Sequence, residues 1–497
     1  MSLLPQFGDI VPSQSQQILN TNYLQWTANG GAGAVPANFA DFAQQYLPEI
    51  YEAEVERYGN RTLAGFLNMV GAEMPMTSDQ VIWSEQNRLH IAYDDCTYAG
   101  GAPTILIIGG GATAQNVMSI NDTVVLLDTV TGTEAKAVVT ATTPGVAGVG
   151  SVTLQFYNGN VLNTAGAVFT SGSIKVFVYG SDYSKGTTIG AGAGNSAARV
   201  SVEPVLTQFS NSPIIIRDQY VVSGSDTAQI GWVNVATEDG TDGYLWYLKA
   251  ASETRLRFQD YLEMAMVEGE LNTNAGAGAY QDLQQPGTQG LFAAIQDRGN
   301  VQTGFTAANG LNEFDAILKN LDTQGAIEEN MLFLQRQTSL DFDDMLAAIS
   351  SGTTGGVAYG LFENSEDMAL NLGFSGFRRG SYDFYKTDWK YLNDASTRGG
   401  FDTALPAALN TSPIEGVLVP AGTSTVYDQV LGTNIRRPFL HVRYRASQTD
   451  DRRMKSWLTG SVGGASSSTL DAMEVNFLSE RCLVTQAANN FVLFKGA

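Results

Sequence analysis

One stretch of the chain, from about Tyr244 to Glu268, repeats its apolar residues at the spacing of an α-helix. Its apolar face is formed by Leu245, Leu248, Ala251, Phe258, Leu262, Ala265 and Met266. Charged residues mark the other side, at Lys249, Glu253, Arg257, Asp260 and Glu263. At about 1.5 Å per residue such a helix is roughly 37 Å long. We therefore expect a helix that crosses a whole domain as its backbone.

Four shorter helices are predicted from capping residues and apolar spacing. In the segment PEIYEAEVERYG, Pro48 suits a first helical position and Gly59 a stop. The segment TLAGFLNMVG follows it after a short turn. Farther along, residues 311–322 keep helical spacing, and a last helix is expected to begin at Thr338-Ser339 and to end at Gly352.

Residues 100–200 have a different pattern, in which apolar and polar residues alternate and turn signals recur. Gly, Ala, Val and Thr dominate this region, and charged residues are few. Three hairpin-like units can be drawn there: INDTVVLLDTVTGTEAKAVVTATT, GSVTLQFYNGN and GSIKVFVYG. Alternation and turns at this spacing predict a small antiparallel β domain.

Further strands are predicted on both sides of the long helix. They fall around Val81–Ser84 and Leu89–Tyr93, within residues 199–235, at Met331–Leu334, and in the segments IEGVLVPAG, RRPFLHVRYRA and MEVNFLSERCLVTQAANNFVLF. The last segment reads as two apolar strands joined by a polar turn. Together these elements indicate a protein of the α+β class.

The chain carries 28 basic and 50 acidic residues, which gives a formal net charge of −22. A surface this acidic repels the phosphates of nucleic acids, so any contact with DNA should be local. Only 16% of the residues are charged, where about a quarter is typical. Because unpaired charge makes large interfaces costly to bury, this composition is compatible with an assembly protein.

The first 45 residues are rich in Gln, Asn, Gly, Ala and Ser and show no sustained period. We expect an extended arm that a neighbouring subunit holds in place. The chain does not begin with a basic region followed by a long apolar core, so no signal peptide is expected. No apolar run approaches the roughly 18 residues that a membrane-spanning helix needs, so none is expected.

The stretch TILIIGGGATAQNV, residues 104–117, matches G-x-G-x-x-A at Gly109, Gly111 and Ala114. In dinucleotide-binding folds such glycines let backbone amides approach a pyrophosphate, and an acid about 20 residues farther on binds the ribose. Asp128 has the right distance from Gly109 for that role. Residues 112–123, however, suit a strand and a turn better than the helix that this fold needs. An NAD-binding oxidoreductase is therefore a remote alternative, and no cofactor is expected.

Few residues are suited to catalysis. The two histidines, His90 and His441, both read as strand residues. The acidic segment DFDD, residues 341–344, falls in the first turn of the helix expected at Thr338, where Thr338-x-x-Asp341 would form a capping box. No G-x-S-x-G, H-E-x-x-H or Walker pattern occurs. We expect no catalytic residues, no metal site and no enzymatic activity.

The two cysteines, Cys96 and Cys482, stand nearly the whole chain apart. Neither belongs to a C-x-x-C or another metal-ligand spacing. The default interpretation is two reduced, partly buried thiols, and a disulfide between them is the minority alternative.

Basic residues gather in residues 371–460, which hold 12 of the 28 basic residues and 8 of the 50 acidic ones, a net charge of +4. The candidate inter-subunit contacts in this window are Arg378, Arg379, Arg436, Arg437, Arg452, Arg453 and Lys455. A basic region on an acidic subunit suits head-to-tail contact between identical chains, because charged pairs fix the register of such contacts. Ordinary ion pairs within one chain are an equal alternative, and a patch that faces DNA is a less favoured one.

The order of these elements is an extended arm, a β-rich excursion, a long helix, a mixed α/β region and closing strands. It resembles the major capsid proteins of tailed double-stranded DNA bacteriophages, which have the Hong Kong-type capsid fold. Two segments are similar to those of the crAss-like phage group: AEVERYGNRTLAGFLNMVGAEMPMTSDQVIWSEQNRLH and FLSERCLVTQAANNFVLF. The resemblance covers most of the chain and is strongest over residues 53–90 and the last 30 residues.

The resemblance implies a division of the chain into the parts of that fold. Residues 1–45 would be the N-terminal arm, and residues 46–99 would be the first part of the peripheral domain. Residues 100–198 would form a small inserted all-β subdomain with the E-loop region, and residues 199–300 would contain the E-loop return strands, the spine helix and the loop that follows it. Residues 301–425 would form the axial domain, and residues 426–497 would be the closing strands of the peripheral domain. The β region is larger than a minimal E-loop, which is why an inserted subdomain is expected.

The resemblance also implies a structural role in a virion. Its members form the pentamers and hexamers of an icosahedral head that encloses double-stranded DNA, and they are made in the cytoplasm of the host bacterium. The expected partners are neighbouring capsid subunits, the portal, auxiliary or decoration proteins and a separate scaffold, with local contact to packaged DNA and no membrane. Another self-assembling protein, of a tail tube, a tail sheath or a surface array, is the structural alternative.

Overall fold

The computed structural model describes residues 65–86, 88–98, 104–109, 115–144, 149–158, 162, 169–186, 202–204, 207–225, 234–236, 242–272, 287–303, 310–325, 327–351, 375–394, 396–400, 413–428, 433–462 and 467–496. The chain divides into two compact units, one formed by Ile82–Ser210 and the other by the residues on both sides of it. The expected arm, residues 1–45, and the helix expected at 48–59 lie outside the described residues.

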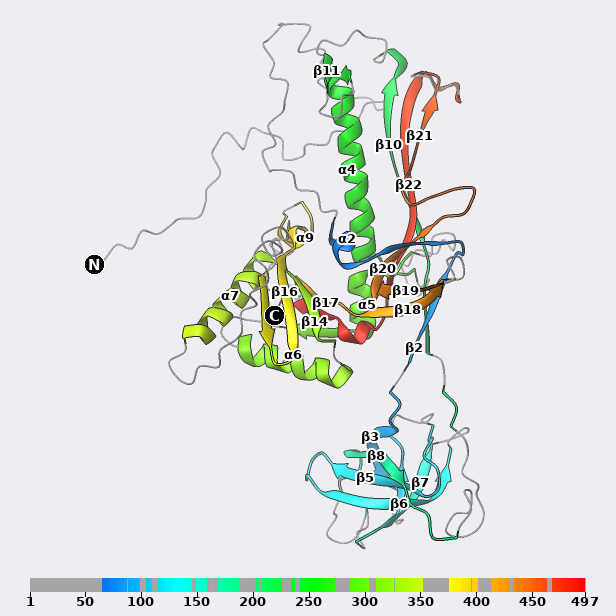
Figure 1. The fold of residues 1–497 in the computed structure, drawn as a ribbon, viewed down its shortest axis with the longest axis vertical. Helices are drawn as coiled ribbons and strands as arrows, with labels where there is room; N and C mark the ends of the chain where they lie inside the picture. Colours follow the sequence, from blue (N-terminus) through cyan, green and yellow to red (C-terminus); the bar gives the residue numbers. More distant parts are fainter. Residues whose placement is uncertain are drawn as a thin grey trace, which may run out of the picture. The chain divides into compact units, whose positions relative to one another are not determined.

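The first unit contains a closed barrel of six strands (Figure 1). Its strands, in chain order, are β3 (Ala92–Tyr98), β4 (Ile105–Ile107), β5 (Asp122–Asp128), β6 (Glu134–Thr143), β7 (Ser151–Phe156) and β8 (Ile174–Ser181). Around the barrel they follow the order β3-β4-β7-β6-β5-β8, and every neighbouring pair is antiparallel. Two more strands, β2 (Val81–Glu85) and β9 (Thr207–Asn211), pair with each other as a ribbon.

The barrel interior is filled by every second residue of its strands. Val124 and Leu126 of β5, Val139 of β6 and Leu154 of β7 are at most 1% exposed. Successive strand residues point to opposite sides of a sheet, so the alternating sequence pattern places these side chains inside and polar ones outside. Because the strands close on one another, the barrel has no free edge strand.

The predicted antiparallel β domain is therefore confirmed, with two differences. Only the first of the three expected hairpins exists, as β5 and β6, since the segments of β7 and β8 each form one strand: β7 pairs with β4 and with the preceding β6, and β8 pairs with β3 and β5. The compact unit also begins at Ile82 rather than near residue 100, because β3 is a barrel strand and places Cys96 in the barrel core.

The second unit contains a five-stranded sheet built around one long strand. Its strands are β1 (Glu73–Met76), β10 (Ile214–Ser223), β20 (Leu440–Arg445), β21 (Lys455–Gly460) and β22 (Ala472–Thr485). One edge of β22 pairs with β10, and the other edge pairs first with β21 and then with β20. The predicted long helix is confirmed as α4 (Leu245–Glu268), which lies along β10 and β22 (Figure 1) and packs Phe258 on Phe477, with ring centroids 5.7 Å apart.

A six-stranded sheet in the same unit has helices on both faces. Its order is β13 (Asn300–Thr303), β23 (Val492–Lys495), β17 (Ile414–Pro420), β14 (Glu329–Leu334), β16 (Tyr382–Asp388) and β15 (Ser375–Arg379). Helices α6 (Gly310–Gln324) and α7 (Arg336–Ser351) cover one face with Phe314 and Phe342, which meet Leu334 and Phe384 of the sheet in one core.

The opposite face of this sheet shares a second core with the five-stranded sheet. Phe333 of β14 packs there with Phe66 of α2 (Phe66–Val70), with Ile295 of α5 (Leu291–Arg298) and with Leu483 of β22. Strand β22 leads through the short helix η3 (Ala488–Asn490) directly into β23 of the six-stranded sheet. The last two strands of the chain therefore join both sheets into one body.

Some element boundaries differ from the prediction. β3 begins at Ala92, so His90 lies just before the strand rather than within it. The segment RRPFLHVRYRA forms two strands, the end of β19 (Thr433–Pro438) and β20, which are separated at Phe439. β19 pairs with β18 (Thr423–Asp428), a partner that the sequence pattern did not identify. Of the helices among the described residues, none is long and apolar enough to cross a membrane.

Asp128 at the end of β5 gives a test of the barrel. Its carboxylate is buried and accepts hydrogen bonds from the amides of Val130, at 2.8 Å, and Thr170, at 2.6 Å. We expect Asp128→Ala to leave these amides unpaired and to cost about 2 to 5 kcal/mol. Faster amide hydrogen exchange in β5 and β6 of the full chain would show this loss. Exchange rates no faster than those of the exposed control variant Asp182→Asn would contradict it.

Candidate functional site

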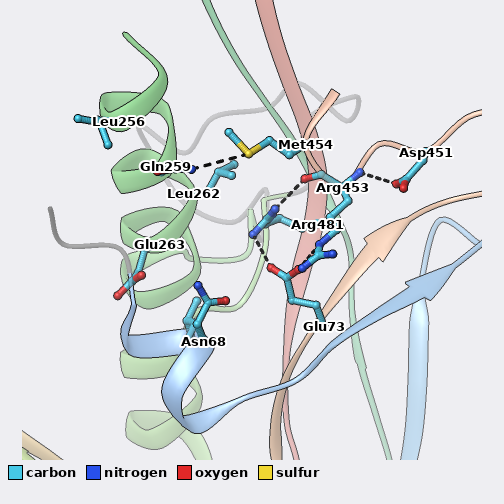
Figure 2. Close-up of a pocket in the computed structure, with 11 residues that line it drawn as sticks. Asn68, Glu73, Leu256, Gln259, Leu262, Glu263, Asp451, Arg453, Met454 and Arg481 are labelled. Carbon is cyan, nitrogen blue, oxygen red and sulfur yellow. Dashed lines mark hydrogen bonds and ion pairs between the residues drawn. The ribbon is translucent and has the colours of Figure 1, made fainter. Parts of the chain in front are cut away.

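A cavity of about 750 Å³ lies between α2, α4 and the five-stranded sheet (Figure 2). Leu67, Leu262 and Met454 contribute apolar walls. Acidic and basic side chains share the remaining lining, with Glu263 from α4 and Arg481 from β22 among them. Charged groups are rarely buried unless they have partners, so the contacts of these two residues decide what the cavity can do.

Glu263 connects α4 to the point where α2 begins. Its carboxylate accepts hydrogen bonds from the amides of Gly65, at 2.6 Å, and Phe66, at 2.9 Å. Burial raises the pKa of Glu263 to about 7, and the nearby Asp260 adds to this effect, while the two amide hydrogen bonds oppose it. The sequence pattern assigned Glu263 to the solvent side of the helix, and the structure corrects this because only 8% of the residue is exposed.

Arg481 is the second buried charge beside the cavity. Its guanidinium donates to the carbonyl oxygen of Arg453, at 2.7 Å, and to Oγ of Ser479, at 2.9 Å, and it pairs with Glu73 of β1 at 3.4 Å. Arg453 also donates to Glu73. Burial lowers the pKa of Arg481, although the Glu73 carboxylate opposes this. As Figure 2 shows, this network joins three parts of the chain: Glu73 of β1, Arg453 in the segment that precedes β21, and Arg481 of β22.

The chemistry of the cavity is that of a structural joint. Its carboxylates and guanidinium groups are engaged with one another or with backbone groups, and the described residues that line it include no hydroxyl, thiol or imidazole side chain. Within the described part of the chain, no group of three His, Cys, Asp or Glu side chains could hold a metal ion. The contacts of Glu263 and Arg481 fix α2 and β1 in place beside the cavity.

The structure places most of the seven candidate contact residues in ion pairs within the chain. Arg378 pairs with Asp383 at 3.4 Å, and Lys455 pairs with Asp450 at 2.6 Å. The further pairs are Arg379 with Asp315, Arg452 with Glu480 and Arg453 with Glu73. For these five residues the intrachain alternative is realised, and an additional role between subunits stays a prediction.

Arg436 and Arg437 differ from the other five. Arg437 is 7% exposed and lies close enough to His441 to lower the pKa of that histidine, so it belongs to the interior of the second unit. Arg436 is exposed and has no ion-pair partner among the residues that the structure describes. Of this pair, only Arg436 has its side chain exposed.

The two histidines have no arrangement suited to catalysis. His441 lies in β20, as predicted, with Nδ1 3.1 Å from the carbonyl oxygen of Pro438. Burial, together with Arg443 and Arg437, lowers the pKa of His441 to about 4, so the ring is neutral at pH 7. His90 is exposed in the other unit.

The dinucleotide interpretation is wrong for this stretch. Ile105–Ile107 forms β4 and Asp122–Asp128 forms β5, and both are antiparallel strands of the barrel rather than parallel strands of a nucleotide-binding sheet. Residues 110–114 lie outside the described residues. The Asp128 carboxylate is engaged by buried turn amides, which hold the pKa of Asp128 well below its usual range against the effect of burial.

The predicted capping box is also wrong. Helix α7 begins at Arg336, two residues before Thr338, and the Arg336 amide donates to Oδ1 of Asn393 at 2.8 Å. Thr338 is buried within the first turn, and Asp343 pairs with the buried Lys386. The first turn of α7 is therefore capped by Asn393, which is 57 residues away in the sequence, so the pattern of neighbouring residues could not identify it.

Both cysteines are free and buried. Cys96 lies in the barrel and Cys482 in β22 of the other unit. Burial raises the pKa of the Cys96 thiol, and it raises that of Cys482 to about 12, so neither has the character of a reactive thiolate.

The two central residues of the joint were missed in the sequence, although each has a signal there. Glu263 directly follows Leu262 and stands three residues before Met266, so it borders the apolar face of α4. Arg481 belongs to the polar triplet Ser479–Arg481, which stands between the apolar pairs Phe477-Leu478 and Cys482-Leu483 of the closing strand. A charged residue inside an apolar run indicates a buried ion pair, but its partner Glu73 is 408 residues away.

No family model matches the chain, and no curated protein matches it. Several solved structures match at low sequence identity. A structure of Microbacterium phage Oxtober96 is 9% identical, with 92% of this chain and 98% of that chain covered and a TM-score of 0.39. The capsid of an empty GTA particle is 10% identical, with 93% and 100% covered and a TM-score of 0.34. A structure of Gordonia phage Cozz is 7% identical, with 95% of this chain and 98% of that chain covered and a TM-score of 0.36. All three TM-scores are too low to establish a shared fold.

Glu263 should make stability depend on pH. Its pKa of about 7 in the folded protein lies above the ordinary glutamate value of 4.5, so the folded state binds the extra proton between these values. Stability then falls as pH rises from about 4.5 to 7, by about 3 kcal/mol for this shift. We expect Glu263→Gln to remove this decrease, as measured by calorimetric melting across that range.

The exposed residue Glu270, just beyond the end of α4, supplies the matched control. The variant Glu270→Gln should keep the pH dependence of the unchanged protein, since no buried carboxylate is lost. If Glu263→Gln kept the same pH dependence as well, Glu263 would not be the group that titrates.

Proposed function

We propose that this chain is a major capsid protein of a tailed bacteriophage, a structural subunit without catalytic activity. Many copies would form the pentamers and hexamers of an icosahedral head that encloses double-stranded DNA. The subunit would be made in the host cytoplasm and act in the virion, with the portal, a separate scaffold and auxiliary or decoration proteins as further partners. The resemblance to the crAss-like group belongs to the same proposal.

One feature of the architecture carries this proposal. The 24-residue helix α4 backs one sheet, and that sheet shares a core with a second, helix-covered sheet. This is the arrangement that the sequence resemblance implies for a peripheral domain with its spine helix and an axial domain. The barrel of the other unit would be the inserted subdomain. One weakly similar solved structure is itself a capsid, but the proposal rests on this chain's own sequence and architecture.

The charge distribution supports a structural role. The described buried charges are mostly joined to partners within the chain, as in the Glu73–Arg481 network, and the described lining of the cavity holds no hydroxyl, thiol or imidazole side chain. The low share of charged residues leaves much of the surface suited to contact between copies. Heterologous contacts between identical chains close into rings, and many small interfaces together give a shell that resists internal pressure.

Negative-stain microscopy of the purified protein tests the proposal against its alternatives. A capsid protein is expected to form closed, round shells as the concentration is raised. Open tubes or flat sheets would instead indicate a tail-tube, tail-sheath or surface-array protein. Separate single subunits at high concentration would contradict every self-assembling function.

Arg436 gives a residue-level test of the contacts between subunits. Since this exposed cation has no ion-pair partner among the described residues, Arg436→Glu should leave the melting temperature within a few degrees of the unchanged protein. We expect the same variant to reduce particle yield severalfold because a neighbouring carboxylate would be repelled. Arg437 is left unchanged, since reversing the charge of a buried residue would damage the fold itself. Equal yields of variant and unchanged particles would remove Arg436 from the interface.

A further inference from the structure

A second groove, separate from the cavity in Figure 2, lies on the five-stranded sheet. It has a volume of about 330 Å³ and is lined by Arg217, Arg452, Lys455, Trp457 and Leu478. In the register of the sheet, Leu478 of β22 is directly opposite Arg217 of β10 on one side and Lys455 of β21 on the other. With neighbouring strands about 4.8 Å apart, the two cationic residues stand roughly 10 Å from each other across Leu478.

This groove lies on the face of the sheet that points away from α4. Ile216 and Phe477 pack against the core under α4. Because successive strand residues alternate between the two faces, their neighbours Arg217 and Leu478 point to the opposite face. Ile215, which shares that face with Arg217, is 55% exposed. The groove therefore combines cations with apolar surface that the chain itself leaves partly uncovered.

The cations of the groove are not fully neutralised within the chain. Lys455 pairs with Asp450, and Arg452 pairs with Glu480 and with Asp450. Arg217 is exposed and has no ion-pair partner in the part of the chain that the structure describes. Glu480 is also shared with Arg445, so among the described residues these cations outnumber their carboxylates. A further carboxylate placed between Arg217 and Lys455 would complete the set.

Trp457 makes the groove suited to a protein ligand. Its ring is half-buried, and the ammonium group of Lys455 lies 5.8 Å from the ring centroid. Tryptophan and arginine are the residue types most enriched where protein interfaces bind tightly, whereas charge alone dominates contact with the DNA backbone. The mixture of an indole, an exposed aliphatic side chain and the exposed guanidinium of Arg217 favours a peptide segment over a run of phosphates.

We propose that this groove receives an acidic segment of a second copy of the chain, with a carboxylate between Arg217 and Lys455 and an apolar side chain on Trp457. Charge complementarity identifies the partner, because each copy carries 50 acidic residues against 28 basic ones and so offers many carboxylates to a basic groove. The inference rests on the proposed self-assembly and deepens it by naming one contact that assembly would use.

Two charge-reversal variants of the full chain test this contact. Arg217→Glu is compared with Lys319→Glu, which reverses an exposed lysine on α6, away from the groove and likewise without an ion-pair partner among the described residues. We expect Arg217→Glu to raise the protein concentration needed for assembly by at least about tenfold and Lys319→Glu to leave it nearly unchanged. Equal behaviour of the two variants, with the unchanged protein assembling normally, would overturn the groove contact and leave the proposed function intact.

Cross-linking of the unchanged protein tests the same contact without a variant. Assemblies of mixed ¹⁴N- and ¹⁵N-labelled copies are treated with a carbodiimide, which joins an amine and a carboxylate that touch. We expect a mixed-isotope peptide that links Lys455 to an Asp or Glu of another copy. Assemblies that give only single-isotope links at Lys455, or a groove that binds duplex DNA in place of a second copy, would overturn the inference. Unchanged protein that never assembles would overturn the proposed function and this contact together.

Discussion

The second unit depends on strand β22, which is paired along both edges and then leads into the second sheet. Its ten-residue ladder with β10 and its pairing with β21 and β20 satisfy the backbone of a strand that is almost wholly buried. Three residues after its last paired position, Thr485, the chain enters η3, and β23 begins at Val492, so the last residues of the chain complete both sheets. Until these residues are in place, the five-stranded sheet lacks β22, around which it is built. The six-stranded sheet then lacks β23, which lies between β13 and β17.

A buried strand that joins two cores must also carry the polar residues that the joint needs. Ser479, Glu480 and Arg481 stand in the middle of β22 and bind Arg453, Arg445 and Glu73, which come from three other segments. Removing one member of such a network costs more than the network contributes, because it leaves a buried charge without a partner. The network therefore specifies which segments meet, while the apolar cores provide most of the stability. The barrel is built differently, since its buried polar residues, such as Asn116 and Asp128, bond groups of the barrel unit itself around an apolar cluster.

Periodicity predicted the long helix and several strands, but it missed α5, β15, β16 and β18 and could not give the pairing of the strands. The spacing from Leu245 onward identified α4 to within one residue, and alternation with turn signals identified β5 and β6 of the barrel. Closure of the barrel, the parallel pairing of β1 with β20 and the cap of α7 by Asn393 depend on contacts between residues far apart in sequence. The paired arginines were visible as a cluster, but their acidic partners, such as Asp315 for Arg379, could be found only in the folded chain. The sequence analysis placed Glu263 on the solvent side of α4, whereas it is buried. Helical spacing shows which residues share a face of the helix, but it does not show how far around the helix the core extends.

The central claim is that copies of this two-sheet unit close into rings and then into a shell. Cryo-electron microscopy of the particles formed by the full chain measures this directly through the symmetry of each ring. The account predicts rings of five and six subunits on one closed surface, each subunit with the α4-backed sheet and the six-stranded sheet in a single body. Particles with one helical symmetry and no fivefold positions, or subunits whose two sheets separate, would contradict it.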